Sequence, residues 1–362
     1  MAAPAIAVTA EQTADTVFRW QTDRCSPSDI PDAPARAFRD SSGVVHLIAG
    51  HEVNRALVGP TLADAKIACD VLFEGGHADD PQQYDDRVWL AAFHTDDGMK
   101  IAALGHAEFH GHLRPALCPS RQYRSCWTNA VIGLTSADGG RRFQRQPGAA
   151  ALVAALPNPY TPDIGRQVGY FSPSNIVTFG EDKYVFVFAE PYREQKRGAC
   201  LLRTRSPADP GSWRAWDGVG FSVSLAANGV CAPVGELQST VTSVVRHVPS
   251  GLFIAVFAAT RADAPEQRKV TGVYYATSRD LLHWSAPSLL LEMPILFAYA
   301  CGAPAVYGYP SLIDHSAETR NFDTVSDRAY LYATRINMIG CKLPMDRDLV
   351  RFPVKIGVPG SP

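Results

Sequence analysis

The sequence predicts an all-β protein built from many short strands. Among its 362 residues are 28 Gly and 27 Pro, and these turn-forming residues are spread along the whole chain. Strand-like apolar runs lie between them. The i, i+3, i+4, i+7 apolar spacing of a long helix is absent, and only one short helix is expected, within residues 61–71. The expected strands are residues 44–49, 87–93, 100–104, 129–134, 175–179, 184–189, 199–204, 240–246, 252–258, 272–276 and 329–333.

The composition excludes several classes of protein. Hydrophobic residues make up 46% of the chain and charged residues 19%, which is too apolar for a disordered chain. A net charge of −2 without basic blocks argues against a nucleic-acid binder. The most apolar stretch, residues 288–301, is interrupted by Glu292 and Pro294, so we expect no membrane span.

The predicted strands group into hairpins that recur along the chain, at residues 35–50, 87–108, 174–189, 240–259 and 310–334. Three units continue into a third strand that ends in Ser, then Asp, then an aromatic residue: Ser136 to Phe143, Ser206 to Trp213 and Ser278 to Trp284. Four-stranded units arranged radially form a β-propeller. We therefore predict a five-bladed β-propeller of four-stranded antiparallel blades, with residues 16–362 as one domain.

The ends and the turns of this predicted propeller have expected roles. Residues 1–15 are expected to be an N-terminal tail, consistent with the remnant of a cleaved signal. The strand at residues 16–20 is expected to close the ring by completing the last blade. In the Ser–Asp–aromatic turns, the Ser and Asp oxygens are expected to accept backbone N–H groups, and the aromatic residue to pack between blades.

The chain has eight cysteines and no Cys-x-x-Cys pair, which excludes zinc-ribbon spacing. Cys118 and Cys126 bracket a short loop and are close enough to bridge. An even number of this size favours disulfides in a secreted or periplasmic protein, whereas buried free thiols are the alternative.

Two of the turns resemble motifs of known propeller enzymes. Ser136-x-Asp138-x-Gly140-x-x-Phe143 resembles the Asp-box of sialidase-type propellers. Ser278-x-Asp280-Leu-x-x-Trp284 is similar to the equivalent turn in the five-bladed arabinanase, xylosidase and invertase superfamily. Tyr309-Pro-Ser-Leu-Ile-Asp314 and Ser172-Pro-Ser-Asn-Ile-Val177 resemble the inner strands of these enzymes.

The resemblance implies a carbohydrate-active enzyme with a pocket on the propeller axis. It implies that Asp32 corresponds to the carboxylate that opens the first inner strand of these hydrolases. The later inner strands depart from the pattern, because they begin with Ser172-Pro-Ser, Gln238-Ser-Thr and Tyr309-Pro-Ser and lack the acid of the family.

Polar residues follow the second strand of each predicted hairpin. They would converge at one end of the propeller axis, at the opening of the axial pocket, which we call the mouth. The segment His106-Ala-Glu108-Phe-His110-Gly-His112 is the most concentrated, and an extended chain places its alternate residues on one face. Three roles stay open for it: holding a divalent cation through His106, Glu108 and His110, acid–base catalysis, or hydrogen bonding to a polar ligand. No cofactor is otherwise expected.

Other residues complete the predicted site. The predicted catalytic residues are Asp32, His106, Glu108 and Glu190, and the predicted substrate-binding residues are Arg36, His51, His110, Tyr170, Asn175, Glu236, Arg261 and Arg335. Clustered arginines would pair with a carboxylate on the ligand, which favours an acidic sugar, although arginines also form salt bridges between blades.

Three functions follow from these residues. The first is a secreted glycoside hydrolase that uses Asp32, Glu108 and Glu190 as its carboxylates. The second is a polysaccharide lyase, in which Arg36, Arg261 or Arg335 neutralises a uronate and a His or Tyr removes the adjacent proton. The third is a glycan-binding propeller without catalysis.

Overall fold

The computed structural model describes residues 6–262 and 268–357 and confirms an all-β fold. The α-helix among these residues is the four-residue α1 (Trp20–Asp23). Short 3-10 turns lie at Pro81–Gln83, Gly111–Leu113, Arg124–Cys126, Gly148–Ala151, Pro210–Ser212 and Leu225–Ala227. The helix predicted within residues 61–71 is wrong, because the Thr61 hydroxyl accepts the Asp64 N–H in a turn and Lys66–Ile67 forms strand β6.

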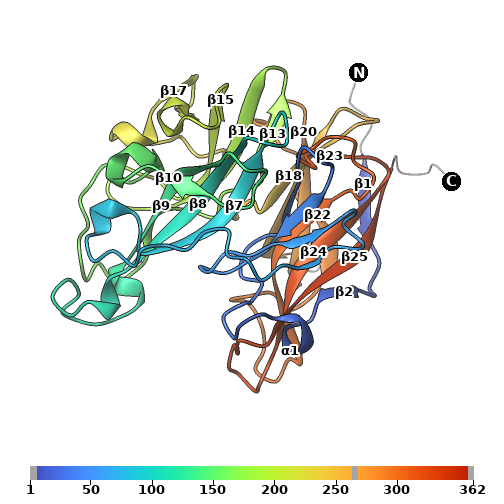
Figure 1. The fold of residues 1–362 in the computed structure, drawn as a ribbon, viewed down its shortest axis with the longest axis horizontal. Helices are drawn as coiled ribbons and strands as arrows, with labels where there is room; N and C mark the ends of the chain where they lie inside the picture. Colours follow the sequence, from blue (N-terminus) through green and yellow to red (C-terminus); the bar gives the residue numbers. More distant parts are fainter. Residues whose placement is uncertain (1–5, 263–267, 358–362) are drawn as a thin grey trace.

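The strands form four hydrogen-bonded sheets, mostly antiparallel (Figure 1). A 4-stranded sheet contains β3 (Arg36–Arg39), β4 (Val45–Ile48), β5 (Leu57–Gly59) and β6. An 11-stranded sheet contains β7 (Arg87–His94), β8 (Ile101–His110), β9 (Trp127–Ser136), β10 (Gln144–Arg145), β11 (Leu152–Ala154), β12 (Val168–Phe171), β13 (Val177–Phe179), β14 (Asp182–Glu190), β15 (Gly198–Thr204), β16 (Arg214–Trp216) and β17 (Phe221–Val223).

The two remaining sheets are 5-stranded. One contains β18 (Ser243–His247), β19 (Phe253–Ala262), β20 (Lys269–Ser278), β21 (Ser288–Glu292) and β23 (Thr324–Val325). The other contains β22 (Ala305–Ile313), β24 (Arg328–Asn337), β25 (Arg347–Gly357), β1 (Ala7–Ala10) and β2 (Asp15–Phe18). All five predicted hairpins are present, as β3–β4, β7–β8, β13–β14, β18–β19 and β22–β24.

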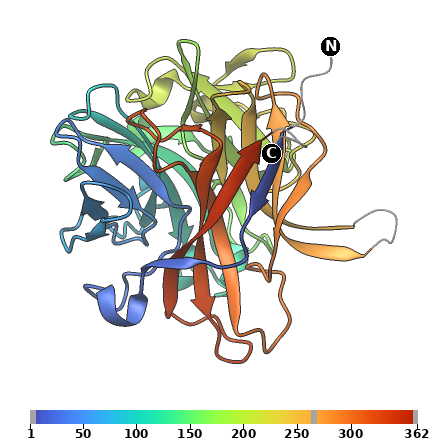
Figure 2. The same cartoon turned by 90° about the vertical axis from the view of Figure 1, so that its right-hand side faces the viewer.

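Both ends of the chain meet in one sheet. β2 pairs with β25 through Asp15–Arg351 and Thr16–Val350, so the predicted closing strand does complete the last sheet. β1 also pairs with β25, and Figure 2 shows the two strands side by side. Ala7–Ala10 was expected in the N-terminal tail, but its ladder hydrogen bonds make it part of the folded domain.

Two of the three Ser–Asp–aromatic turns, at Ser136 and Ser278, act as the sequence predicts, whereas in the third the Ser206 hydroxyl accepts no backbone N–H of the described residues. Asp138 accepts the backbone N–H groups of Arg141 and Arg142, and the Ser136 hydroxyl accepts the N–H of Gly140. Asp280 accepts the corresponding N–H groups of its own turn. The turn aromatics Phe143, Trp213 and Trp284 are buried in three different hydrophobic clusters, where each contributes roughly 1.5–3 kcal/mol.

Arg36 lies at the centre of the molecule and joins segments that are far apart in the sequence. Its Nε donates to Ala91 O at 2.7 Å, and Nη2 donates to Pro173 O at 3.1 Å and to Thr242 O at 2.7 Å. Its Nη1 donates to Ser311 Oγ at 3.0 Å and to Ala35 O at 3.1 Å.

These five contacts correct the predicted substrate-binding role of Arg36. A guanidinium group has five N–H donors, and all of them are used inside the protein. The residue is only 3% exposed, so its charge does not reach a ligand. Arg36 is therefore a structural residue of the axis.

The eight cysteines form four disulfides. They join Cys25 to Cys69, Cys118 to Cys126, Cys200 to Cys231 and Cys301 to Cys341. The predicted Cys118–Cys126 bridge is therefore confirmed, and the alternative of buried free thiols is wrong. Four disulfides are consistent with an extracellular or periplasmic protein. Within residues 6–262 and 268–357, no helix has the length and apolar character needed to cross a membrane.

Candidate active site

The candidate site is built around the end of β8. This strand pairs with β7 on one side and β9 on the other, which places Glu108 between Arg87 and Asn129. Nε2 of His110 lies 2.6 Å from Glu108 Oε2, and Nδ1 of His106 lies 3.6 Å from Glu108 Oε1. The predicted common face of these β8 residues is therefore confirmed. The strand ends before Gly111, and His112 lies in the turn that follows.

Burial controls the protonation of this cluster. The Glu108 side chain is 10% exposed, and burial raises its pKa to about 7; the charge of Asp32 raises the pKa further, whereas His106 opposes the rise. Burial also lowers the pKa of His110 to about 4. Below pH 7, the proton held between Glu108 and His110 therefore resides mainly on the carboxyl group.

The orientation of His106 supports the same protonation state. Asn129 donates its Nδ2–H to Val168 O at 2.9 Å, which leaves its Oδ1 to accept the Nε2–H of His106 at 3.0 Å. Nδ1 of His106 is then an acceptor and faces Glu108. Burial lowers the pKa of His106 and keeps the ring neutral. A protonated Glu108 thus lies between two neutral imidazole rings.

A cleft opens next to this cluster. It has a volume of about 250 Å³ and is lined by Asn129 and by the side chains of Tyr84, Tyr160 and Tyr192. Since Asn129 also holds His106, one residue joins the cleft to the Glu108 cluster.

Asp32 is held in a different environment. It accepts a hydrogen bond from the Tyr309 hydroxyl at 3.1 Å and an ion-paired hydrogen bond from Arg347. Nε2 of His51 lies 3.9 Å from its other oxygen. The backbone N–H of Asp32 donates to Ala49 O, which fixes the segment before β3 to the end of β4. The Asp32 carboxylate is thus held by a guanidinium group and by a hydroxyl donor.

A β-bulge directs Tyr309 toward Asp32. The register of β22 against β24 shifts between Gly308 and Ser311, and Tyr309 has a φ of 56°, a value that bulky residues rarely adopt. Pro310 interrupts the ladder at this point because it lacks an N–H. Burial raises the pKa of the Tyr309 hydroxyl, which stays protonated and donates to Asp32.

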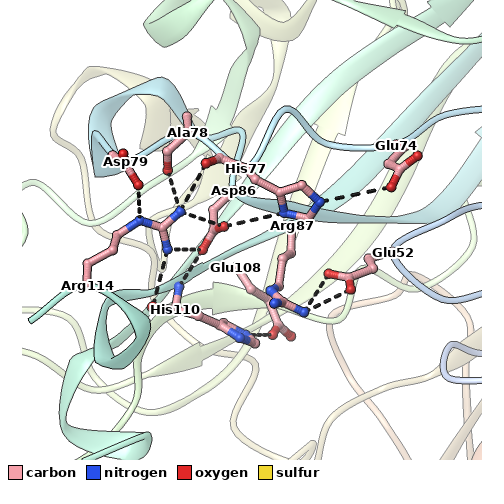
Figure 3. A network of polar contacts seen from close by, with 10 residues as sticks. All are labelled: Glu52, Glu74, His77, Ala78, Asp79, Asp86, Arg87, Glu108, His110 and Arg114. Carbon is pink, nitrogen blue, oxygen red and sulfur yellow. Dashed lines mark hydrogen bonds and ion pairs between the residues drawn. The ribbon is translucent and has the colours of Figure 1, made fainter. Parts of the chain in front are cut away.

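Two ion pairs support the walls of the site (Figure 3). Arg87 contacts both oxygens of Glu52, at 2.9 and 2.8 Å. Arg114 binds Asp86, whose carboxylate also accepts the backbone N–H of His110 at 2.8 Å. The second pair fixes the backbone that carries His110, and so the position of the Glu108 partner.

Tyr170 and Asn175 are placed in structural roles, contrary to the prediction that they bind substrate. Tyr170 is 0% exposed and donates its hydroxyl hydrogen to Gln195 Oε1 at 2.5 Å. The Asn175 side chain donates its Nδ2–H to Val244 O at 2.6 Å, and its Oδ1 accepts the backbone N–H of Val244 at 2.8 Å. Both side chains hold neighbouring strands together because their polar groups are already paired.

The other two predicted carboxylates lie away from the Asp32–Glu108 pair. Glu190 pairs with Arg197 at 3.4 Å, and within the described residues no contact joins it to Asp32 or Glu108. Glu236 is exposed in a loop, and the group that its charge affects is His283, in the turn after β20. Asp32 is linked to Glu108 through its charge, which raises the pKa of Glu108.

The predicted arginine cluster is not formed. Arg335 pairs with Asp348 at 2.7 Å. Arg261 lies in the outer part of the β19–β20 hairpin, which projects from the body of the molecule (Figure 2). Together with the buried Arg36, these positions leave no central group of three guanidinium ions.

The three predicted cation ligands, His106, Glu108 and His110, form hydrogen bonds with protein side chains. His110 Nε2 lies at direct hydrogen-bonding distance from Glu108, and His106 Nε2 is used by Asn129. Among the residues that the structure describes, the group close enough to surround a metal ion is Cys118, Cys126 and Asp163, and its two sulfur atoms are joined in a disulfide. Disulfide sulfur lacks the thiolate charge that binds metals.

Sequence reasoning missed Tyr309 and Arg347 as site residues. Both reach Asp32 across more than 270 positions of sequence. The Tyr-Pro pair at 309–310, inside an otherwise strand-like segment, is the signal that would have indicated a bulge. No local pattern distinguishes Arg347 from other arginines at strand starts.

Known structures share this fold. An α-L-arabinanase of Cellvibrio cellulosa, solved with arabinohexaose, has a TM-score of 0.50 at 10% identity and covers 89% of this chain and 91% of its own. The catalytic domain of a GH62 α-L-arabinofuranosidase from Coprinopsis cinerea has a TM-score of 0.53 at 11% identity, with coverage of 96% and 97%. A glycosyl hydrolase from Bacteroides ovatus has a TM-score of 0.54 at 8% identity, with coverage of 98% and 94%.

No family model and no curated protein sequence matches the chain. At 8 to 11% identity, the structural likeness concerns the fold. The resemblance to the arabinanase superfamily that the turn motifs predict is therefore confirmed for the fold of the whole chain, whereas the activity must be argued from the site.

Proposed function

We propose that the protein is a glycoside hydrolase in which Glu108 is the general acid and Asp32 is the general base or nucleophile. The observation that supports it most is the contrast between the two carboxyl groups. Glu108 is buried between neutral imidazoles and holds its proton near pH 7, while Asp32 is bound by Arg347 and a tyrosine hydroxyl. Pairs of carboxyl groups held in opposite states carry out glycosidic cleavage.

The chemistry follows from these states. Glu108 donates its proton to the glycosidic oxygen as the bond from that oxygen to the anomeric carbon breaks, so the leaving sugar departs as an alcohol. Asp32 either takes a proton from the attacking water or bonds to the anomeric carbon itself, in which case water later releases the sugar. If Asp32 is the base, Asp32 releases the proton of the water to solvent and the ionised Glu108 is reprotonated from solvent. If Asp32 is the nucleophile, the ionised Glu108 takes the proton of the water that releases the sugar and so regains its acid form.

The positions of the three candidate arginines weigh against the lyase alternative, which needs a free guanidinium group beside the substrate. Arg36 is buried and fully hydrogen-bonded, Arg335 pairs with Asp348, and Arg261 lies in the outer part of the β19–β20 hairpin. The same contacts remove the reason to expect an acidic sugar. A neutral glycan is therefore the substrate class that we propose, and the arabinan and mannan named with the structural relatives are suitable first substrates.

The test is hydrolysis of a panel of arabinan, xylan, mannan and pectin by the purified protein. New reducing ends without absorbance of unsaturated uronates support the hydrolase. That absorbance would support a lyase instead, and binding without either product would support a glycan-binding propeller. The anomeric configuration of the first product, read by proton NMR, assigns Asp32 as base or nucleophile.

Three variants then locate the chemistry. Glu108→Gln and Asp32→Asn keep the shape of each side chain, and each is expected to reduce kcat by at least about 10²-fold. Glu181→Gln changes a carboxyl group that is 80% exposed and paired with Arg205, and serves as the matched control. Wild-type activity in both central variants would exclude the proposed acid–base pair.

We also propose that the chain forms five blades and works outside the reducing cytosol. The 11-stranded sheet divides into β7–β11 and β12–β17 if the two-residue parallel pairing of β9 with β12 is regarded as a contact between blades. The contacts of Arg36 with five separate segments support this count. The four disulfides support export, and export is tested by the protein fraction in which the native protein is recovered.

A further inference from the structure

We infer that Tyr123, Trp127 and His112 form an aromatic platform that binds the leaving-group sugar, so that the substrate is an oligosaccharide or polysaccharide with a sugar on that side of the bond. This inference rests on the proposed function, because it assumes that Glu108 protonates the leaving group. It adds to the proposed function a binding site for the leaving-group sugar, made of residues other than Glu108 and Asp32.

The platform is a set of packed rings with an exposed member. The rings of Tyr123 and Trp127 are stacked, with centroids 4.8 Å apart and an angle of 23° between their planes. The His112 ring lies edge-on to Tyr123 at 4.9 Å. Tyr123 is nevertheless 42% exposed. An exposed aromatic ring held by other rings is suited to contact the apolar face of a sugar, at little cost in side-chain entropy.

The loop that carries the platform is fixed at several points. The Cys118–Cys126 disulfide closes the segment that contains Tyr123. The hydroxyl of Tyr160 donates to Leu117 O at 3.1 Å. At the start of the loop, Arg114 binds Asp86 and the backbone carbonyls of residues 77 and 78 (Figure 3). The platform is thus held rigidly before any ligand arrives.

The platform adjoins Glu108 rather than Asp32. The His110 ring, which is hydrogen-bonded to Glu108, lies 5.3 Å from the Tyr123 ring and 5.8 Å from the Trp127 ring. Asp32 is instead bound by residues of β22 and β25, on the other side of the mouth. A sugar on the platform would therefore lie beside the acid, where the leaving group belongs.

Unpaired donors provide a second, independent observation. Nε1 of Trp127 and Nδ1 of His112 are buried and have no hydrogen-bond partner among the described residues. The same holds for Nε1 of Trp89, Nδ1 of His51 and Nε of Arg87, whose side chains contact His106, Asp32 and Glu52 respectively. Buried polar atoms of a folded protein are usually paired, so unpaired atoms next to Glu108 and Asp32 support a polar ligand such as a sugar hydroxyl.

The experiment compares two substrates of the same sugar. One is the oligosaccharide that the panel shows to be hydrolysed. The other is the glycosyl fluoride, whose leaving group is too small to reach the platform and departs without acid assistance. Tyr123→Ala removes the ring, Tyr123→Phe keeps it, and Phe179→Ala is the control, because Phe179 is a similarly exposed aromatic (38%) on another blade.

The expected result is a change confined to one substrate. Tyr123→Ala should lower kcat/KM for the oligosaccharide by about tenfold or more, leave the fluoride within about twofold, and be rescued by Tyr123→Phe. An equal loss on both substrates would overturn the inference, since it would show a general loss of site structure. A loss on the oligosaccharide together with a shifted alkaline limb of its pH–rate profile would overturn it as well, since Tyr123 would then act through Glu108. An unchanged oligosaccharide rate would overturn it too.

A binding measurement separates this inference from the proposed function. If the wild type cleaves no glycan, the proposed hydrolase fails, and the platform is tested with arabinohexaose, xylohexaose and mannohexaose by tryptophan fluorescence. Binding that Tyr123→Ala weakens and Phe179→Ala does not would support the platform. Absence of binding to all three by the wild type would overturn it.

Discussion

Replacing Arg36 by Met tests the structural role that the contacts assign to this residue. Methionine is nearly as long and fills much of the same space, but it has no N–H donor. The variant therefore removes all five hydrogen bonds of the guanidinium group while keeping the axis packed. Activity is expected to change little at a temperature where the variant is folded.

The magnitude follows from the acceptors that lose their donor. Ser311 and Ala35 keep a hydrogen bond with each other, at 2.7 Å. The carbonyls of Ala91, Pro173 and Thr242 lose the donor that Arg36 supplies, at about 1–3 kcal/mol each. Removing a buried charge returns part of this sum, so the net loss of unfolding free energy is about 3–5 kcal/mol.

The assay is thermal unfolding followed by circular dichroism. Unfolding entropy is about 2.1 cal/mol/K per residue, so a chain of 362 residues should lose about 4–7 °C in Tm. Arg205→Met, at a side chain that is 69% exposed, is the control and should change Tm by less than about 1 °C. An Arg36→Met variant with wild-type Tm but lost activity would refute the reasoning and return Arg36 to the binding site.

Four further predictions concern the candidate site and the disulfides. The folded-state pKa of Glu108, about 7, lies above the ordinary value of 4.5, so the folded protein binds the extra proton between these values. Stability should then fall as the pH rises from 5 to 8, by up to about 3 kcal/mol from this residue, and Glu108→Gln should remove that part of the decrease in Tm. As the general acid, Glu108 should also make kcat/KM fall above about pH 7, a limb to be read from a pH–rate profile of the identified substrate. Chelation with EDTA should leave activity and Tm unchanged, because His106 and His110 are engaged in hydrogen bonds; a loss restored by added zinc or calcium would contradict this. Replacing Cys118 and Cys126 by Ser should cost about 2–3 kcal/mol and weaken oligosaccharide binding, whereas replacing Cys25 and Cys69 should lower Tm without affecting that binding.

The repeating hairpins made most of the fold predictable from the sequence. Each hairpin carries its own turn signal and apolar strands, so residues close in sequence determine it. The Asp138 and Asp280 turns are equally local, since each carboxylate binds N–H groups within four positions. The segment at 61–71 failed because its apolar residues follow a helical spacing while Thr61 and Asp64 form a turn.

The site was only partly predictable, for a related reason. Glu108 and its histidines were found because they alternate along one strand. Arg36 was misassigned because its sequence shows a charge near a strand start, and nothing local shows that four distant segments supply its acceptors. Tyr170 and Asn175 were misassigned in the same way, because their partners lie on other segments. Partners brought together by ring closure leave no pattern in the sequence.

The position of the second carboxyl group distinguishes this site from the pattern that the resemblance implies. Asp32 precedes an inner strand, as in that pattern, but the later inner strands begin with Ser172-Pro and Tyr309-Pro, and both residues have positive φ, of 50° and 56°. At the first of these strand starts, the Pro173 carbonyl accepts a hydrogen bond from Arg36. At the second, the Tyr309 hydroxyl donates to Asp32. The acid that we propose, Glu108, lies on another element, at the end of β8, next to the imidazoles of His106 and His110. If Glu108 is the acid, it lies on the same blade as the Tyr123 loop, and that loop is then expected to set which leaving-group sugar the site accepts.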